Sequence, residues 1–374
     1  MRIGIQQRAL PQFRVALYDA IARATKGEVE VFTGHPESDE GVRQARSLNH
    51  ATWRTTKNRR FSVGQHRFYW QKDFRTWIKT FRPDVLLVES NPRILSNYSG
   101  IRLARYMDIL VIGWGIGVMG NSEDTGLYGR AMRNYFLQFD GMIAYGSKGA
   151  RDFINLGVGG ERVFIAPNAV FNEAADKLFR NPKEARELVR DFKERRALGH
   201  CPIILFLGRM IEEKNIDLLL DSMTKVNQQC QLLLVGDGPI KKRLEERAKA
   251  LQINAIFTGY LEGLELALAI NACDVCVLPG SGGLAVQEVM GMGRPVISGK
   301  ADGTQYDLIQ DGVTGFHLNL TTSTALSERL SFCLSRPNLL KRLGSSARKF
   351  VLEKHNVHLT VDGVFSAIRT LEER

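Results

Sequence analysis

Two series of short apolar runs, separated by a charged stretch, constrain the fold of this chain more than any other feature. The first series lies at residues 29–32, 85–89, 109–114, 142–145 and 163–166, and the second at 203–207, 232–235, 255–257, 275–278 and 295–298. The runs are continuously apolar, which is typical of parallel strands covered by helices on both faces. Helical stretches lie between them. The pattern therefore predicts an α/β fold of two Rossmann-like, doubly wound domains.

The charged stretch at residues 172–200 contains no β-like run and indicates where one domain ends and the next begins. We expect an N-terminal domain at residues 1–170, a linker at 171–200 and a C-terminal domain at 201–351. A chain of 374 residues is long enough for two domains of about 150 to 200 residues each.

Hydropathy and cysteine usage indicate a cytoplasmic protein. No run approaches the roughly 18 to 20 apolar residues that a membrane span needs, and residues 1–13 lack the apolar core of a signal peptide. The five cysteines are scattered through apolar segments, as is usual for free thiols in a reducing compartment. Cys273 and Cys276 have no second pair at ligand spacing, so they predict core packing rather than zinc binding.

Positive charge is concentrated in the first half of the chain. The net charge is +11, and residues 1–168 hold 24 Lys and Arg against 15 Asp and Glu. Residues 51–82 alone carry nine basic and eight aromatic residues but one acid. Such a segment suits an anionic membrane surface, a phosphorylated acceptor or nucleic acid. We therefore expect residues 54–82 to contain the contact with an anionic partner.

Part of this segment can also be explained by packing within the protein. The aromatic residues from position 70 onward recur at helical spacing, which predicts a helix face packed on a sheet with the intervening basic residues in solvent. These aromatic residues are Trp70, Phe74, Trp77 and Phe81. The irregular basic run at 54–67 is then the better candidate for the surface contact.

The loops after the second series of strands are rich in glycine. They read Gly208-Arg209, Gly236-Asp237-Gly238-Pro239, Gly259-Tyr260 and Pro279-Gly280-Ser281-Gly282-Gly283. Parallel strands bring their carboxyl ends to one edge of the sheet, where open α/β domains bind ligands. Glycine allows close backbone approach, and a glycine-rich loop that opens a helix offers N–H groups to phosphate. With the cations Arg209 and Lys214 beside them, these loops predict a nucleoside diphosphate site.

Five segments of the second half occur in the order of a known family. They read FLGRMIEEKNIDLLLDSM, LLLVGDGPIKKRLEE, IFTGYLE, ACDVCVLPGSGGLAVQEVMGMGRPVISG and DGVTGF. They resemble the donor domain of family-4 retaining glycosyltransferases with the GT-B fold, over about residues 202–316. In the first half, RALPQFRVALYDAIA, RPDVLLVESN and VFIAPNAVF are similar to the acceptor domain of that family. The resemblance implies two domains facing each other across a cleft, with C-terminal helices at about residues 352–374 that cross back onto the first domain.

The resemblance also implies an activity. A sugar would pass from a nucleoside diphosphate sugar, with a UDP-sugar as the expected donor, to a glycan or lipid-linked acceptor in the synthesis of cell-surface polysaccharide or glycolipid. Arg209 and Lys214 match the catalytic pair that holds the diphosphate, and Glu288 matches the residue that binds the ribose. The other expected donor-binding residues are Gly208, Gly236, Gly238, Gly259, Tyr260, Leu261, Gly282, Gly283 and Leu284. Because the chain contains no Asp-x-Asp, neither a metal nor another cofactor is expected.

Two positions depart from the family pattern. Gly280 stands where the first of two family glutamates is usual, in a Pro-Gly variant that resembles a subset of the family. Ile116 stands where the first domain usually presents a histidine. The residues expected near the acceptor or the transferred sugar are Arg8, Arg14, Trp114, Ile116 and Gly280. The departures keep a nucleotide-sugar-binding protein without catalysis as one alternative.

Two further alternatives come from other features. Gly115-x-Gly117-x-x-Gly120 matches the dinucleotide loop of a NAD-dependent oxidoreductase, but Asp140 precedes the next strand instead of ending it. The basic residues of 54–82 fit a glycosyltransferase that acts on nucleic acid, although no groove-reading motif accompanies them.

Overall fold

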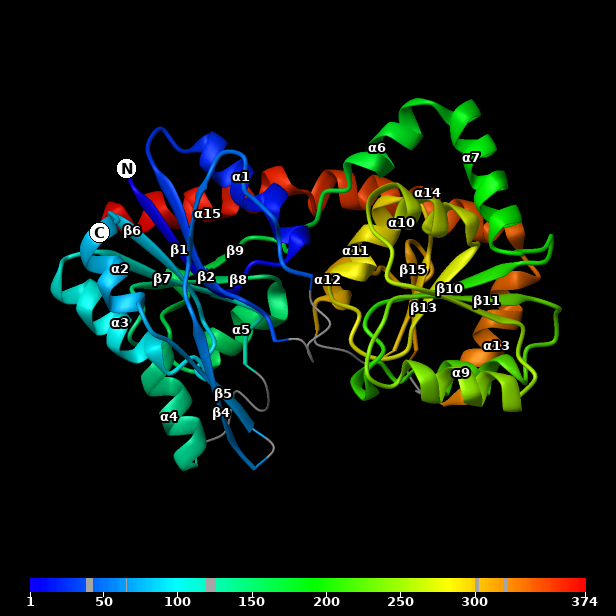
Figure 1. Ribbon diagram of the computed structural model, residues 1–374, viewed down its shortest axis with the longest axis horizontal. Coiled ribbons are helices and arrows are strands. Elements are labelled where there is room, and N and C mark those ends of the chain that lie inside the picture. The colour runs from blue at the N-terminus through cyan, green and yellow to red at the C-terminus, as the bar shows by residue number, and fades with distance from the viewer. Residues whose placement is uncertain (38–42, 65, 119–125, 300–302, 319–321) are drawn as a thin grey trace. The chain divides into compact units, whose positions relative to one another are not determined.

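The chain folds into two compact units, each built on a parallel sheet (Figure 1). The computed structural model describes residues 1–37, 43–64, 66–118, 126–299, 303–318 and 322–374. One unit comprises Met1–Val170 and Asn356–Arg374, and the other comprises Phe171–His355. Helices alternate with the strands in both units. The expected doubly wound α/β architecture is therefore confirmed.

The first unit contains a seven-stranded sheet. Its strands are β1 (Ile3–Ala9), β2 (Val29–Gly34), β3 (Thr52–Thr55), β6 (Val85–Glu89), β7 (Leu110–Gly115), β8 (Gly141–Ala144) and β9 (Val163–Ile165). They lie in the order β3-β2-β1-β6-β7-β8-β9, and all neighbouring pairs are parallel. Because the order runs outward from β1 and β6, their carboxyl ends form the topological switch point at which such sheets bind ligands.

Helices cover both faces of this sheet. The helices of the unit are η1 (Gln12–Arg14), α1 (Val15–Ala24), α2 (Phe74–Phe81), α3 (Ser96–Tyr106), α4 (Leu127–Phe136), α5 (Ser147–Asn155), η3 (Gly160–Arg162) and α15 (Val357–Glu372). One core cluster joins α1 and α15 to the sheet through Leu17, Ile21, Val364 and Ile368. A second cluster joins the helices α2, α3, α4 and α5 to the other face of the sheet. In the described part of the chain, no helix has both the length and the hydropathy needed to cross a membrane.

The basic segment forms a hairpin and a helix. β4 (Asn58–Val63) and β5 (His66–Gln71) pair antiparallel and project from the first unit (Figure 1). The predicted packing role is confirmed for the helical aromatic residues, because Phe74, Trp77 and Phe81 are buried. It is wrong for Trp70, which lies in β5 and is 37% exposed.

β1 occupies the centre of its sheet although it is not a continuous apolar run. Gln6 and Gln7 interrupt the apolar sequence of this strand, and both are buried. The Gln6 amide donates to Gln71 Oε1 at 2.6 Å, and Gln6 Oε1 accepts from the Glu89 backbone N–H at 3.1 Å. These partners come from distant segments, so a search for apolar runs does not detect this strand.

The second unit contains a six-stranded parallel sheet in the order β12-β11-β10-β13-β14-β15. The strands are β10 (Ile203–Leu207), β11 (Gln231–Val235), β12 (Ala255–Gly259), β13 (Val275–Leu278), β14 (Val296–Ser298) and β15 (Gly315–His317). The helices are α6 (Glu173–Arg180), α7 (Pro182–Arg195), η4 (Glu212–Lys214), α8 (Ile216–Met223), α9 (Lys241–Ala250), α10 (Gly263–Ala272), α11 (Leu284–Gly291), α12 (Gln305–Leu308), α13 (Ser323–Leu334) and α14 (Pro337–Lys354). One apolar core holds the unit together.

The stretch expected as a linker at 171–200 is helical and belongs to the second unit. α6 and α7 both pack against α10, and Leu178 and Phe192 are buried there. Charged residues dominate both helices because one narrow face of each is sufficient for this packing.

Candidate functional site

Glycines bring together the loops at the carboxyl edge of the second sheet. Gly236 follows β11 with φ +136°, and a Cβ on it would lie 1.9 Å from the carbonyl oxygen of Gly208. A Cβ on Gly238 would lie 2.3 Å from the carbonyl oxygen of Met210. The Gly236 N–H donates to the carbonyl oxygen of Gly259 at 2.9 Å. The loops after β10, β11 and β12 can therefore meet only while these positions lack side chains.

Lys214 ends η4 and extends toward the loop after β13. Its Nζ donates a hydrogen bond to the carbonyl oxygen of Ser281. Its side chain passes beside Gly208, where a Cβ would lie 3.7 Å from Lys214 Cε. Arg209 follows Gly208 directly and is partly buried. The structure thus brings Lys214, the end of β10 and the loop after β13 together.

Asn215, the residue after Lys214, connects η4 to α8. Asn215 has φ +52° and ψ +42°, in the left-handed region, and it caps the start of α8. Asparagine is one of the few residues other than glycine that adopt this conformation at low cost.

Gly280 packs against η4 and does not face open space. It is buried, and a Cβ on it would lie 2.2 Å from the Glu213 carbonyl oxygen and 2.9 Å from Lys214 Cα. The Ser281 N–H donates to the same Glu213 oxygen at 3.3 Å. A glutamate side chain at position 280 would displace η4. The absence of a side chain at position 280 is therefore a condition for the contact between this loop and η4.

The glycine loop leads into the N-terminus of α11, as the sequence predicts. Gly283 is the N-cap residue with φ +57°, and no atom lies within 4 Å of a Cβ built on it. No side chain caps this helix end. Open space beside uncapped backbone N–H groups at the positive end of a helix suits an anion. Gly282, in contrast, packs on Val286.

Glu288 lies in α11, near the carboxyl edge of the sheet. Burial raises the pKa of its carboxyl group, and a hydrogen bond from Asn172 opposes that shift. The Asn172 Nδ2 donates to Glu288 Oε1 at 3.2 Å, while Asn172 Oδ1 accepts from the Ala175 N–H at the start of α6. A buried carboxylate needs such a partner. Asn172 was not among the predicted site residues, because it is 116 positions away in the sequence.

The stretch predicted to meet the base follows β12. Tyr260 is 40% exposed, and Leu261 is partly buried. Gly259 has φ +73°, which a side chain would not readily allow. Asp237, on the neighbouring loop, accepts a hydrogen bond from the Gly238 N–H at 2.8 Å and so stabilises its turn.

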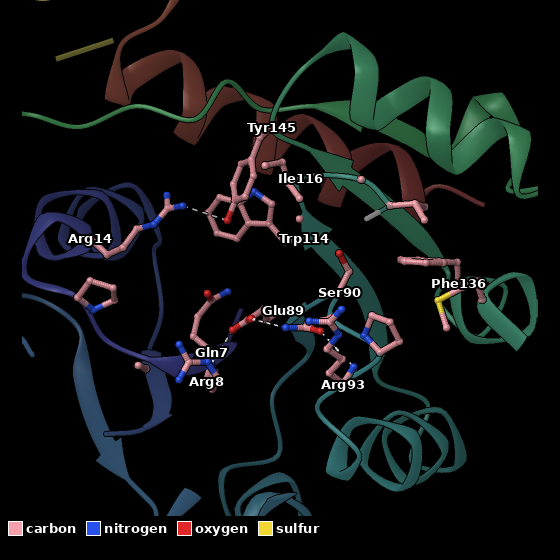
Figure 2. A pocket seen from close by; sticks show the side chains of 18 of the residues that line it. Gln7, Arg8, Arg14, Glu89, Ser90, Arg93, Trp114, Ile116, Phe136 and Tyr145 are labelled. Carbon is pink, nitrogen blue, oxygen red and sulfur yellow. Dashed lines mark hydrogen bonds between the residues drawn. The ribbon is translucent and has the colours of Figure 1, made fainter. Parts of the chain in front are cut away.

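A cavity of about 320 Å³ lies at the switch point of the first sheet (Figure 2). The ends of β1, β6, β7 and β8 and the turn before α1 contribute to its lining. Four predicted residues line it: Arg8, Arg14, Trp114 and Ile116. Gly280, the fifth residue predicted for the acceptor or sugar, belongs to the second unit and is not part of this lining.

Arg14 and Tyr145 form the polar contact at one end of this cavity. Arg14 Nη2 donates to Tyr145 Oη at 3.1 Å, and the guanidinium carbon lies 5.1 Å from the centre of the tyrosine ring. Burial raises the pKa of Tyr145, and the charge of Arg14 opposes this shift. The Trp114 ring lies 6.1 Å from the Tyr145 ring, centre to centre. The tyrosine therefore remains a neutral hydroxyl beside a positive charge.

Sequence reasoning missed several residues of this cavity, including Gln7, Glu89, Ser90 and Tyr145. Glu89 Oε2 accepts from the Arg8 backbone N–H at 2.7 Å, and Glu89 Oε1 accepts from Asn91 Nδ2 at 3.4 Å. The available signal was their position, because Glu89 ends β6, Ser90 follows it and Tyr145 follows β8. Polar residues at the carboxyl ends of parallel strands are candidate ligand contacts.

The structure does not place Asp140 where a dinucleotide-binding site would need an acid. Asp140 precedes β8, and its carboxylate accepts from the Val111 backbone N–H at 2.8 Å, near the amino end of β7. The acid is therefore at the edge of the sheet opposite to the loop Gly115–Gly117. Gly120, the last glycine of the motif, lies outside the described residues.

The two neighbouring cysteines lie in the core of the second unit, as predicted. Cys273 and Cys276 are buried, and burial raises the pKa of both thiols. Among the described residues, no group of three or more His, Cys, Asp and Glu side chains has an arrangement that could hold a metal ion.

The second unit is similar to a known family. Residues 190–350 match the family model described as glycosyl transferases group 1. The chain is 26% identical over 206 residues to the alpha-D-kanosaminyltransferase of Streptomyces kanamyceticus, covering 53% of each protein. It is 38% identical over 124 residues to sulfoquinovosyl transferase SQD2 of Arabidopsis thaliana, covering 32% of this chain and 24% of that one. The matches thus span about half or less of the length of these relatives.

The fold of the whole chain is that of a solved structure. The crystal structure of Anabaena Alr3699/HepE in complex with UDP and glucose superimposes with a TM-score of 0.77, over 99% of this chain and 100% of that chain. The two sequences are 16% identical. The predicted GT-B fold is therefore confirmed, whereas membership in the Pro-Gly subset remains a prediction.

Gly280→Ala should destabilise the second unit, because its Cβ would collide with the backbone of η4. We expect a loss of about 1 to 3 kcal/mol in the free energy of unfolding. All four tryptophans lie in the first unit, so tryptophan fluorescence follows that unit while circular dichroism follows both. The circular dichroism transition should shift and the fluorescence transition should not. Gly291→Ala is the control, since its Cβ would make an ordinary 3.4 Å contact. Equal stability of the two variants would contradict the packing role of Gly280.

Proposed function

We propose that this protein is a retaining glycosyltransferase that takes a sugar from a nucleoside diphosphate sugar, with UDP as the nucleotide. The observation that carries the proposal is the meeting of Lys214 with the glycine loop that opens α11, within the region that matches the model of glycosyl transferases group 1. A cation and a helix N-terminus at one place suit a diphosphate. The choice of UDP is supported by the UDP in the Anabaena structure, which has the same fold.

The proposed chemistry follows from charge. The bond between the anomeric carbon and the diphosphate breaks, and the diphosphate leaves with the bonding electrons. The acceptor hydroxyl oxygen forms the new bond on the same face of the sugar, and its proton passes to the departing phosphate oxygen. Arg209, Lys214 and the N–H groups of α11 stabilise the negative charge that grows on the leaving group. No metal is needed in this proposal, because the cations of the chain neutralise the diphosphate.

The nucleoside is assigned to the residues around this diphosphate site. Glu288 accepts hydrogen bonds from the ribose hydroxyls, with its carboxylate held by Asn172. The exposed ring of Tyr260 and the backbone of Leu261 meet the base. With glycine at 280 and isoleucine at 116, the sugar would be bound by other groups than the usual carboxylate and histidine. A protein that binds the donor without transfer is the alternative.

We assign the acceptor to the cavity of the first unit. A glycan or lipid-linked acceptor fits its combination of polar side chains with the rings of Trp114 and Phe136. The proposed setting is the cytoplasmic face of a membrane, where polysaccharide or glycolipid precursors would be available.

The β4–β5 hairpin supports the proposed membrane contact. In the antiparallel register, Phe61 pairs with Phe68 and Arg59 pairs with Trp70, so these four residues share one face. Phe61 and Val63, two positions apart on this face, are 48% and 67% exposed. Exposed aromatic and aliphatic side chains next to arginine suit the boundary between anionic headgroups and acyl chains. A glycosyltransferase that acts on nucleic acid is the alternative reading of the same charge.

Lys214→Ala and Arg209→Ala should each lower turnover of the UDP-sugar by roughly 100-fold, as when one donor that stabilises transition-state charge is lost. Release of UDP from a panel of UDP-sugars measures the rate. Lys225→Ala is the control, because this lysine of the same unit bonds to Ser323 and Thr324 on the surface. Losses below threefold in both site variants would remove these residues from the mechanism.

Exchange of Arg59 and Arg60 for glutamate should weaken the affinity for anionic liposomes, measured by sedimentation, by roughly 30-fold or more, because about 1 kcal/mol of attraction is lost for each of the two basic residues. UDP affinity should stay unchanged. Arg23→Glu with Lys26→Glu gives the same change in net charge on exposed residues of the first unit and should have less effect. If the hairpin variant sediments like the wild type, the hairpin is not the membrane contact. Loss of salt-dependent DNA retention without a liposome effect would favour the nucleic-acid alternative.

A further inference from the structure

Four buried hydrogen-bond donors in the cavity of the first unit have no partner within the described structure. They are Gln7 Nε2, Arg14 Nη1, Ser90 Oγ and Trp114 Nε1. Each of these residues is more than nine-tenths buried. A buried polar atom without a partner costs roughly 1 to 3 kcal/mol. A group of four such atoms around one cavity is therefore the mark of a site that a ligand completes.

The four donors come from separate elements and surround one space. Gln7 belongs to β1, Ser90 follows β6, Trp114 belongs to β7 and Arg14 ends η1. Figure 2 shows the Gln7 amide directed toward the middle of the group, with Arg14 and Trp114 together at the Tyr145 end. Ser90 Oγ lies beside Gly115, where a Cβ would be 2.2 Å from it, and both residues line the cavity. A ligand that reaches all four must itself carry several hydrogen-bond acceptors.

The charges of the lining favour an anion. Three arginines, Arg8, Arg14 and Arg93, line the cavity, and Glu89 is the acid among its described lining residues. The Glu89 carboxylate already accepts two hydrogen bonds, from the Arg8 backbone and from Asn91. Arg14 keeps one nitrogen without a partner while the other donates to Tyr145. The positive charge of the cavity thus exceeds its negative charge.

We infer that this cavity binds an acceptor that carries a carboxylate or phosphate on a hydroxyl-bearing sugar. The anionic group, which accepts hydrogen bonds and donates none, lies between Arg14 Nη1 and Trp114 Nε1. Gln7 and Ser90 bind sugar hydroxyls, and Glu89 accepts a hydrogen bond from one of them. This inference rests on the proposed function, since it names the acceptor class of the same enzyme.

The size of the cavity and the apolar part of its lining suit a single sugar ring. A cavity of about 320 Å³ is at the low end of the range for small-molecule sites. Phe136 lies on the side opposite to Arg14, where the apolar face of a sugar can pack (Figure 2), and Met132 is also part of the lining. The anionic group is therefore expected on the ring that occupies the cavity.

The test is binding of three probes to the full chain without donor: methyl α-D-glucuronide, glucose 6-phosphate and methyl α-D-glucoside. Calorimetry gives the affinities, and the indole N–H resonance of Trp114, assigned with Trp114→Phe, reports the place of binding. At least one anionic probe should bind ten-fold more tightly than the neutral glucoside and shift the Trp114 resonance. Preference for the glucuronide identifies a carboxylate, and preference for the phosphate identifies a phosphoryl group. Equal affinity for all three probes, or no shift of Trp114, overturns the inference.

Arg14 variants separate a binding role from a structural one. Arg14→Gln should abolish the anionic preference and leave the affinity for the neutral glucoside unchanged, whereas Arg14→Lys should retain part of the preference. Arg75→Gln, on the exposed side of α2, is the control. If Arg14→Gln lowers the affinities for all probes equally, its role is structural and the inference fails.

A parallel titration with UDP, GDP and ADP separates this inference from the proposed function. Nucleoside diphosphate binding without an anionic preference in the cavity would refute the acceptor class alone. An anionic preference without binding of any nucleoside diphosphate would refute the proposed transferase and leave an anion-binding cavity.

Discussion

The close approach of backbone segments at the carboxyl edge of the second sheet is the constraint on which the candidate donor site depends. Gly236 rests on the carbonyl oxygen of Gly208, and Gly280 rests on the backbone of Glu213 and Lys214. These contacts hold the loop after β13 against η4, where the Lys214 ammonium group reaches the carbonyl oxygen of Ser281. A side chain at any of these glycines would separate the loops. The cation and the N-terminus of α11 are therefore positioned by the absence of side chains around them.

Buried polar groups determine the rest of the two sites. In the second unit, burial raises the pKa of Glu288, and the hydrogen bond from Asn172 opposes this shift. In the first unit, buried donors surround a cavity without meeting a partner. Apolar cores of similar design support both sheets. What differs between the units is the chemistry at the strand ends, a glycine-rich edge in one and an arginine-rich cavity in the other.

The sequence was sufficient for the fold class and for the positions of the glycine loops, because continuous apolar runs and loop glycines are local signals. It was not sufficient where a residue depends on a distant partner. Gln6 in β1 is tolerated through Gln71, and Glu288 is held by Asn172. Trp70 follows the helical spacing of its neighbours, yet it belongs to the hairpin because the helix begins only at Phe74. The cavity residues Glu89 and Ser90 became recognisable once the strand order placed the end of β6 next to that of β1.

The most direct measurement is a calorimetric titration of the full chain with UDP, GDP, ADP and NAD in parallel, in buffer that contains a chelator of divalent metals. We predict micromolar binding of UDP, and we predict that Lys214→Ala weakens it at least ten-fold. Micromolar binding of GDP or ADP in place of UDP would keep the transferase and change the donor. Binding of NAD alone, or no binding of any of the four, would contradict the proposed donor site.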